Sequence, residues 1–261
     1  PPGGVAADSS PELARTLNAM ASEDSALIVI PPNLDPLLGQ TLDRDLDLYA
    51  LTARETTGET MSEIVAGRDI VFLALGELAG GVLDLGAQHW LDERGYRAWD
   101  GWFGPTQLVL YGLSSGPDQA ETQFVNASLG NSLSLKAFSI WDQQATAGGL
   151  LYLTLLWETS EPVGQNYKVF VHLLDGDGHL VAQRDSEPLN GLRPMATWQP
   201  GETVNDRVGL WLPGSLSPGQ YHLLVGLYDP ETLERLPVFD ASGRAAGDTI
   251  PLGSITIPAS E

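Results

Sequence analysis

The chain has 261 residues, of which 43% are hydrophobic and 18% are charged, and its net charge at pH 7 is −21. This apolar content is enough to build packed cores, and the length favours two domains, because single cores rarely grow beyond ~250 residues. A strongly acidic surface repels phosphate backbones, so we expect no nucleic acid among the partners. The lack of cysteine excludes disulfides, thiolate zinc sites and cysteine nucleophiles.

The apolar segments bear on membrane insertion. The longest runs, LLYLTLLW at 150–157 and IVFLAL at 70–75, are shorter than a membrane-spanning helix of ~20 residues. We therefore expect no direct insertion of this chain into a bilayer. Residues 1–9 lack the basic and apolar regions of a signal peptide, and we interpret them as a linker.

Residues 10–113 alternate between helical and strand patterns. Apolar residues at helical spacing predict helices over 11–21, 34–46, 58–67 and 80–95, while short apolar runs predict strands at 25–32 and 69–75. The segment 96–112 predicts a hairpin. Alternating helices and strands indicate a small layered α/β domain.

The helical period ends after the polar segment 114–130, which we interpret as an interdomain linker. From 131 to 258 the pattern changes to short strands separated by turn sequences. The expected strands lie at 132–140, 150–158, 167–174, 179–186, 202–212, 221–229, 235–239 and 250–257. This half is expected to be an all-β domain, an antiparallel β-sandwich of the immunoglobulin-like or jelly-roll-like kind.

The sequence DGDG at 175–178 is open to three interpretations, namely a metal-binding loop, a pocket for the two flanking histidines, or a hairpin turn. A calcium loop requires an acid or amide at its fifth position and glycine at its sixth, where this chain has His179 and Leu180. A zinc site with His172 and His179 would need a third ligand. Because Asp-Gly is a strong turn signal, we expect a plain hairpin with no metal and no cofactor.

Strand alternation through this hairpin predicts two faces. If Leu173 lies opposite Leu180, the core face carries Val169, Val171, Leu173, Leu180 and Ala182. The other face then carries Phe170, His172, Leu174 and His179, and the two histidines lie diagonally across the strands.

Two short motifs resemble catalytic or nucleotide-binding signatures. GLSSG at 112–116 matches G-x-S-x-G, but a polar segment follows it where a nucleophile elbow needs a helix. GELAGG at 76–81 lacks the G-x-G-x-x-G spacing of a dinucleotide-binding turn. The acids Asp43, Asp45 and Asp47 alternate with leucines, as on a solvated face. We therefore assign no catalytic residue.

Tryptophans offer the one candidate binding surface in the sequence. Trp157 alternates with Leu151, Leu153 and Leu155 and is expected in the core, whereas Trp211 shares a strand face with Arg207 and Asn205. Trp211 could stack on a sugar ring while Arg207 and Asn205 donate hydrogen bonds, or it could pack beneath a loop.

Several segments resemble a known family. WLDERGYRAWDGWFGPTQLVLYG at 90–112, with DIVFLAL before it, looks like the extracytoplasmic α/β portion of multi-span membrane glycosyltransferases of the protein-mannosyltransferase and aminoarabinose-transferase type. YKVFVHLLDGDGHLVAQRDSEP, TWQPGETVNDRVGLWLP and GQYHLLVGLYDPETLERLPVFD resemble the β-sandwich that follows it in some bacterial members. The family uses a polyprenyl-phosphate sugar donor at an acid in its membrane part, which has no counterpart here.

The resemblance implies a soluble, extracytoplasmic region tethered by an upstream membrane-spanning portion of the same polypeptide. Two functions then stand. One is an accessory module, not itself an enzyme, that binds the glycan or protein acceptor of the transferase. The other is a structural or protein-interaction module of the cell surface with no glycan role.

Overall fold

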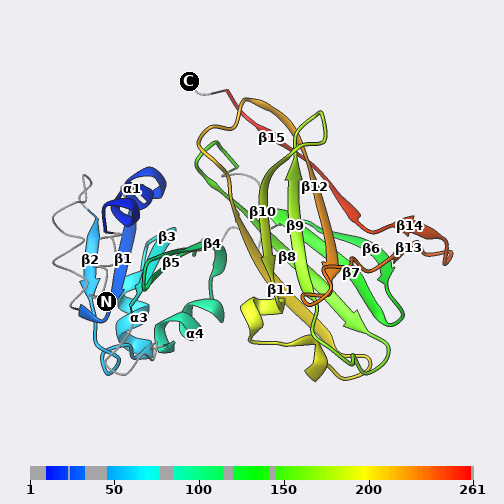
Figure 1. Ribbon diagram of the computed structural model, residues 1–261, viewed down its shortest axis with the longest axis horizontal. Coiled ribbons are helices and arrows are strands. Elements are labelled where there is room, and N and C mark those ends of the chain that lie inside the picture. The colour runs from blue at the N-terminus through cyan, green and yellow to red at the C-terminus, as the bar shows by residue number, and fades with distance from the viewer. Residues whose placement is uncertain are drawn as a thin grey trace, which may run out of the picture. The chain divides into compact units, whose positions relative to one another are not determined.

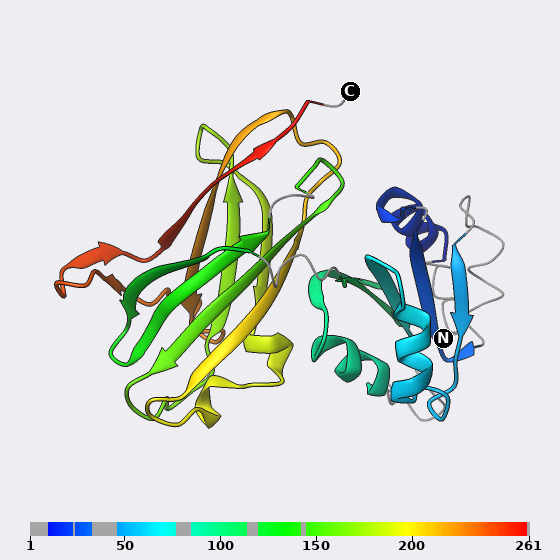
Figure 2. The same ribbon diagram turned by 180° about the vertical axis from the view of Figure 1, so that it is seen from behind.

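The chain folds into two units, Pro1–Ser114 and Ser115–Glu261, seen from two sides in the computed structural model of Figures 1 and 2. The structure describes residues 10–22, 24–32, 46–76, 85–113, 120–141 and 145–259. Each unit has its own core and is treated by itself. No helix in these ranges is both long enough and apolar enough to cross a membrane.

The first unit is built on a mixed sheet with the strand order β2-β1-β3-β5-β4. The strands β1 (Ser25–Ile30), β2 (Asp47–Ala50) and β3 (Ile70–Leu75) run parallel, and β4 (Tyr96–Phe103) and β5 (Thr106–Gly112) add an antiparallel hairpin to β3. β1 is buried along its whole length, as the apolar residues that follow Ser25 predict. The expected hairpin over 96–112 is present.

Three helices accompany this sheet in the described ranges. They are α1 (Ser10–Met20), α3 (Gly58–Val65) and α4 (Gly86–Asp92), close to three of the predicted helices. The Thr57 side chain accepts a hydrogen bond from the Thr60 backbone N–H and so caps α3. The prediction over 34–46 falls outside the described residues apart from Leu46, as does most of GELAGG.

The acidic run at 43–47 is partly described. Asp47 begins β2, a strand that the sequence pattern did not predict, and its carboxylate forms an ion pair with Arg68. Arg68 also donates a hydrogen bond to the Tyr49 hydroxyl on the same strand. Asp43 and Asp45 lie outside the described residues.

The second unit contains a six-stranded sheet with the order β11-β8-β7-β6-β13-β14, seen from its side of the unit in Figure 2. Its strands are β6 (Thr122–Leu129), β7 (Leu133–Trp141), β8 (Leu150–Thr159), β11 (Thr203–Trp211), β13 (Val238–Phe239) and β14 (Ala245–Gly247). All of their pairings are antiparallel.

A four-stranded antiparallel sheet with the order β10-β9-β12-β15 completes this unit (Figure 1). It consists of β9 (Lys168–Leu174), β10 (Leu180–Ser186), β12 (Gly219–Tyr228) and β15 (Ile250–Ile257). Both sheets supply side chains to one buried cluster, which includes Leu153, Trp157, Val171, Val225 and Ile255. The second unit is therefore a β-rich domain of two antiparallel sheets around a common core, and Trp157 is a core residue as predicted.

Two sequence predictions for this unit are wrong. The segment 114–130 was interpreted as a linker, but β6 occupies residues 122–129. Only Ala127 and Leu129 of β6 are buried, so most of its residues can be polar. Its sequence therefore resembles that of a loop between domains. Leu180 was placed in the core, but it is 47% exposed because a register shift at Val181 breaks the alternation of β10.

A buried carboxylate lies where the edge strands β10 and β11 meet. Asp206 on β11 is fully buried, and its Oδ1 accepts a hydrogen bond from the Leu189 backbone N–H at 2.7 Å. Leu189 belongs to the short helix η3 (Pro188–Gly191), where it and Asn190 have φ angles of 49° and 56°. The left-handed backbone costs about 1–3 kcal/mol per residue and persists only when its surroundings hold it. Asp206 is one such anchor.

Burial dominates the electrostatics of this carboxylate. It raises the pKa of Asp206 to about 6, against the opposing effects of the Leu189 N–H, the Trp157 indole and the charges of Arg184 and Arg207. Arg184 also donates a hydrogen bond to the Asn190 side chain at 3.2 Å. A second short helix, η4 (Met195–Thr197), follows and buries Met195.

Candidate functional site

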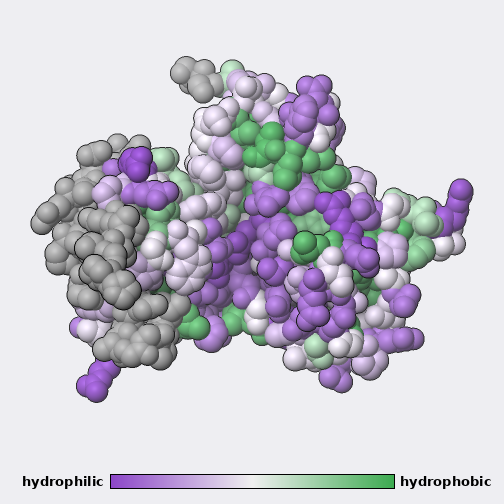
Figure 3. Space-filling view, in the orientation of Figure 1, coloured by the Kyte–Doolittle hydropathy of each residue, from purple (hydrophilic) through white to green (hydrophobic). Residues whose placement is uncertain are grey.

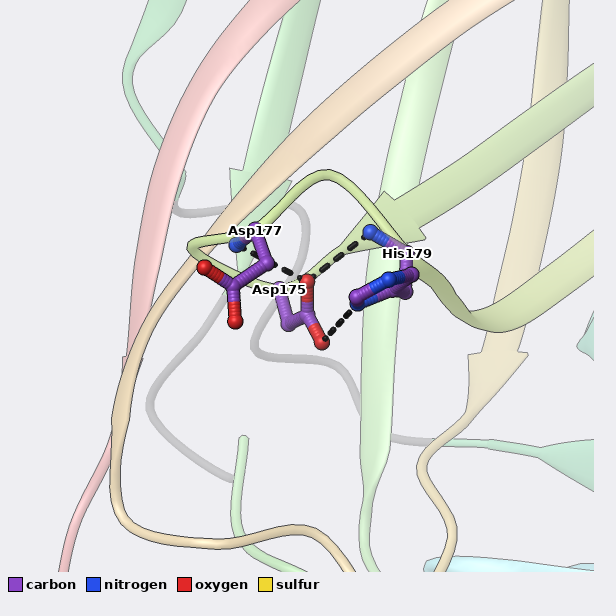
Figure 4. A group of neighbouring side chains, drawn as sticks. All are labelled: Asp175, Asp177 and His179. Carbon is purple, nitrogen blue, oxygen red and sulfur yellow. Dashed lines mark hydrogen bonds and ion pairs between the residues drawn. The ribbon is translucent and has the colours of Figure 1, made fainter.

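The DGDG sequence forms the turn between β9 and β10 (Figure 4). The Asp175 backbone N–H donates to the His179 carbonyl at 3.0 Å, and Gly178 adopts a φ of 84°, which closes a short loop. Asp175 Oδ1 accepts from the backbone N–H groups of Asp177 and His179 at 3.0 and 2.8 Å. These hydrogen bonds, chiefly that from the His179 backbone, hold the pKa of Asp175 below its ordinary value. The carboxylate therefore stabilises the turn.

The same turn contains a group of three side chains close enough to share a cation. Ligand atoms of Asp175, Asp177 and His179 lie within 4.8 Å of one another. In Figure 4, however, the Asp175 carboxylate points toward the His179 ring, with Oδ2 3.2 Å from Nδ1, while the Asp177 carboxylate lies on the other side of Asp175. Both Asp175 carboxylate oxygens thus already have partners within the turn. The hairpin turn itself accounts for the closeness of the three side chains. The expectation of no bound metal remains a prediction.

The predicted pairing of the two strands is off by one residue at Leu174 and by two residues beyond the register shift. Leu174 pairs with Leu180, and His172 pairs with Gln183 beyond the register shift. His179 consequently belongs to the exposed turn, while His172 lies within the sheet. The two histidines do not form the diagonal strand pair that the sequence suggested.

The outer face of the four-stranded sheet gathers an unexpected set of side chains. Val169, Val171 and Leu173 of β9 face the core, so Phe170 and His172 face outward. Across the sheet, Phe170 lies opposite Asp185 on β10 and Gly226 on β12, and His172 lies opposite Gln183 and Leu224. We call Phe170, His172, Asp185, Tyr228 and Arg235 the outer-face cluster.

Phe170 is the centre of this cluster. It is only 1% exposed although it lies on the outer face, because other side chains cover it. The ring centroids of His172 and Tyr228 lie 4.7 and 6.3 Å from its own, and the Arg235 guanidinium lies 4.5 Å from the ring centroid. Gly226 makes room for the ring, since an added Cβ would come 2.3 Å from Phe170 Cζ. Phe170 therefore supports the polar side chains around it.

Asp185 joins the polar members of the cluster. It accepts a hydrogen bond from the Tyr228 hydroxyl, and burial together with the Asp185 charge raises the pKa of Tyr228 to about 12. His172 Nε2 lies 4.0 Å from Asp185 Oδ1. Burial lowers the pKa of His172 below its ordinary value, and the charge of Arg235 adds to that effect while Asp185 opposes it. At neutral pH this surface presents a neutral imidazole beside a carboxylate and a phenol.

Apolar and polar groups alternate around this cluster. Figure 3 shows hydrophobic surface gathered over part of the four-stranded sheet, with hydrophilic surface beside it. The partly exposed Leu174 and Leu224 lie on the same face as His172, and His222 Nδ1 forms a 3.0 Å hydrogen bond with Ser254 Oγ in the next row. Arg235 is 3.5 Å from Asp248. Such a surface can pack against a ring and exchange hydrogen bonds with hydroxyl groups.

The residues chosen from the sequence, Trp211, Arg207 and Asn205, lie on the outer face of the six-stranded sheet. They pair with Leu150, Thr154 and Leu156 of β8, and the intervening Val204, Val208 and Leu210 are buried, so the predicted division of faces is correct. Asn205 is exposed, whereas Trp211 is partly buried and its Nε1 is enclosed. Trp211 as a stacking platform remains a prediction.

Sequence reasoning missed the outer-face cluster for a specific reason. Alternation along β9 did place Phe170 and His172 on one face, away from the core. Asp185, Tyr228 and Arg235 join them only through the pairing of β9 with β10 and β12. No local pattern in the sequence encodes that long-range pairing.

Comparisons with known proteins find distant structural matches only. No protein-family model and no curated protein sequence matches the chain. Among solved structures, the C-terminal domain of wzt is 14% identical, with a TM-score of 0.33 over 52% of this chain and 80% of that chain. A Bordetella pertussis structure described as an ApaA protein is 12% identical, with a TM-score of 0.25 over 53% of this chain and 99% of that chain.

A third similar structure is a Bifidobacterium dentium beta-glucuronidase complexed with coumarin-3-O-glucuronide. It is 11% identical, with a TM-score of 0.25 over 58% of this chain and 20% of that chain. At these scores the likenesses assign neither a family nor a ligand to the chain.

Proposed function

We propose that the second unit is a non-catalytic carbohydrate-binding module whose ligand lies on the outer face of the four-stranded sheet. The observation that carries the proposal is the outer-face cluster, in which aromatic rings and hydrogen-bonding groups share one regular surface. A sugar ring has an apolar side and a rim of hydroxyl groups. The apolar side would lie on His172 and Leu224, and the hydroxyl groups would meet Asp185, Gln183 and Tyr228.

The setting of this module is part of the same proposal. From the segments that resemble membrane glycosyltransferases, we take the chain to be the extracytoplasmic accessory region of an enzyme that uses a polyprenyl-phosphate sugar donor. The module would hold the glycan or protein acceptor near the membrane-spanning portion of the same polypeptide. Its two antiparallel sheets with a common core support a β-sandwich of the immunoglobulin-like or jelly-roll-like kind.

A titration of the full chain with bacterial surface oligosaccharides tests the proposal. We expect amide chemical shifts to change around His172 and Asp185, with dissociation constants on the order of millimolar to high micromolar, because an open sheet face buries little ligand area. His172→Ala and Tyr228→Phe should weaken binding. His89→Ala, which changes an exposed histidine of the first unit, is the matched control.

The titration also tests Trp211. Shifts centred on Trp211, Arg207 and Asn205, with binding lost in Trp211→Ala and kept in His172→Ala, would move the site to the other sheet. Failure to bind any glycan would contradict the proposed function.

A protein-interaction module is the second candidate, and one observation favours it. Phe124 on β6 is 78% exposed and Leu233 is 71% exposed, so a protein partner that covered either side chain would bury a large apolar surface. Loss of partner capture in Phe124→Ser, combined with an absence of glycan binding, would support this alternative.

A further inference from the structure

A cleft lies at one end of the second unit, apart from both sheet faces. It has a volume of about 260 Å³ and is lined by residues 129–133, residues 161–164, Tyr167 and Leu236. Three connections supply these residues, namely the turn between β6 and β7, the connection from β8 to β9, and the segment that precedes β13. The cleft is smaller than the ~300–1,000 Å³ of pockets for drug-sized ligands. Its size suits a ligand of about one sugar ring.

Backbone hydrogen bonds fix the walls of this cleft. The Ser160 N–H donates to the Ser132 carbonyl at 2.9 Å, which ties the β8–β9 connection to the β6–β7 turn. The buried Thr159 hydroxyl lies 2.5 Å from the Glu161 carbonyl, and it orients the residue at the rim. The Gly130 N–H donates to the Pro237 carbonyl at 2.9 Å and brings in the third connection. A ligand would therefore meet a preorganised wall and would not have to order it.

Gly130 also shapes the cleft by lacking a side chain. Its φ of 57° lies in the left-handed region, and an added Cβ would come 3.0 Å from Leu236 Cδ2. A side chain at this position would therefore be strained by the backbone and would push against Leu236, which lies on the cleft wall.

The lining combines an apolar floor with a polar rim. Leu129, Leu133 and Val163 are buried, and the partly buried Tyr167 and Leu236 pack against the same core. Asn131 and Glu161 are exposed at the rim, where an amide and a carboxylate can bond to hydroxyl groups. Among the lining residues Glu161 alone carries a formal charge, so the cleft disfavours an anionic ligand.

We infer that this cleft binds a single uncharged sugar residue, with one side of the ring against Tyr167 and its hydroxyl groups bonded to Glu161 and Asn131. The inference rests on the proposed glycan function, because it adds a second subsite to the same module. It differs from that function in place and in selectivity. The outer-face cluster lies on a sheet surface, whereas the cleft lies between three loops and disfavours acidic sugars.

The test uses the full chain with glucose, galactose and mannose as probes and glucuronate as the charged comparison. Two-dimensional NMR should show shifts at residues 130–132 and 161–167 for at least one neutral hexose, with a dissociation constant on the order of millimolar. Glucuronate should bind about tenfold more weakly or not at all. Glu161→Gln and Tyr167→Ala should each weaken hexose binding about tenfold or more, since each removes a principal contact.

Controls separate binding from folding. Tyr167→Phe keeps the ring and its packing and should retain most of the affinity if stacking dominates. Glu121→Gln removes an exposed carboxylate just before β6, at the end of that strand remote from residue 129, and should leave affinity unchanged. Native spectra outside the cleft must be preserved in every variant that is scored.

The outcomes distinguish this inference from the proposed function. Oligosaccharide binding that is lost in His172→Ala but unchanged in Glu161→Gln and Tyr167→Ala would overturn the cleft and leave the sheet site standing. Equal affinity for glucose and glucuronate would overturn the selectivity on which the inference depends. Absence of binding by every glycan would overturn both.

Discussion

Asp206 should give the second unit an unusual dependence of stability on pH. Its pKa rises from 3.8 when unfolded to about 6 in the folded chain, so the folded state binds more protons than the unfolded state between these values. Stability must then increase as the pH falls through this window, the reverse of an ordinary surface carboxylate. Between pH 7 and pH 5 this one group should add about 1 kcal/mol to the free energy of unfolding, because each pKa unit corresponds to about 1.4 kcal/mol.

The comparison that isolates this effect is with Asp206→Asn, which keeps an oxygen for the Leu189 N–H and removes the titration. Hydrogen exchange of the β8 and β11 amides at pH 5 and pH 7, corrected for intrinsic exchange rates, reports the unfolding free energy of this unit. The change in unfolding free energy between pH 7 and pH 5 should differ between the two proteins by about 1 kcal/mol. The contribution of His172, which has the opposite sign, is present in both proteins and cancels in the difference. Parallel changes in the two proteins would refute the reasoning.

Four further predictions follow from particular contacts. Gly226→Ala should destabilise the second unit by about 1–3 kcal/mol in urea unfolding, because its Cβ would collide with Phe170; an unchanged midpoint would contradict this. NMR titration should give His172 a pKa below 6.5, and Arg235→Gln should raise that pKa. Because the folded state binds a proton on His172 less readily than the unfolded state, the stability that His172 contributes is lost as the pH falls below 6.5. Asp175→Ala should lower the melting temperature, because the turn loses the acceptor of two backbone N–H groups. A chelator should leave the melting temperature of the wild-type chain unchanged. A decrease with chelator that one metal ion restores would contradict our interpretation of the turn. Limited proteolysis should cleave before β6 begins at Thr122 and release two folded pieces. Unfolding of both pieces after a single cleavage would contradict the division into two domains.

The sequence was most informative where one physical signal dominated. Alternation of Leu151, Leu153, Leu155 and Trp157 predicted both a strand and its buried face, and the structure confirms both. β6 and β2 were missed because each buries few side chains, so neither carries a strong apolar pattern. Their places in the sheets depend on backbone hydrogen bonds to neighbouring strands, which composition does not encode.

The candidate site was less predictable than the strands. Trp211, Arg207 and Asn205 were correctly assigned to one face, since alternation along a single strand is local information. The outer-face cluster needs three strands and a loop in the correct register. The one-residue shift near Val181 shows how a local irregularity defeats an extrapolated pairing.

The order of the four-stranded sheet also determines when its outer surface can exist. β9 pairs with β12 through contacts such as His172 with Leu224, so the sheet cannot form until the chain has been synthesised past Tyr228. Pairings between such distant segments form slowly, because a long loop must close first. Asp185 and His172 can meet early in the β9–β10 hairpin, but Tyr228 and Arg235 arrive only with β12 and the segment after it. A ligand on this surface would therefore bind only chains that have completed folding, and it would shift the population further toward them.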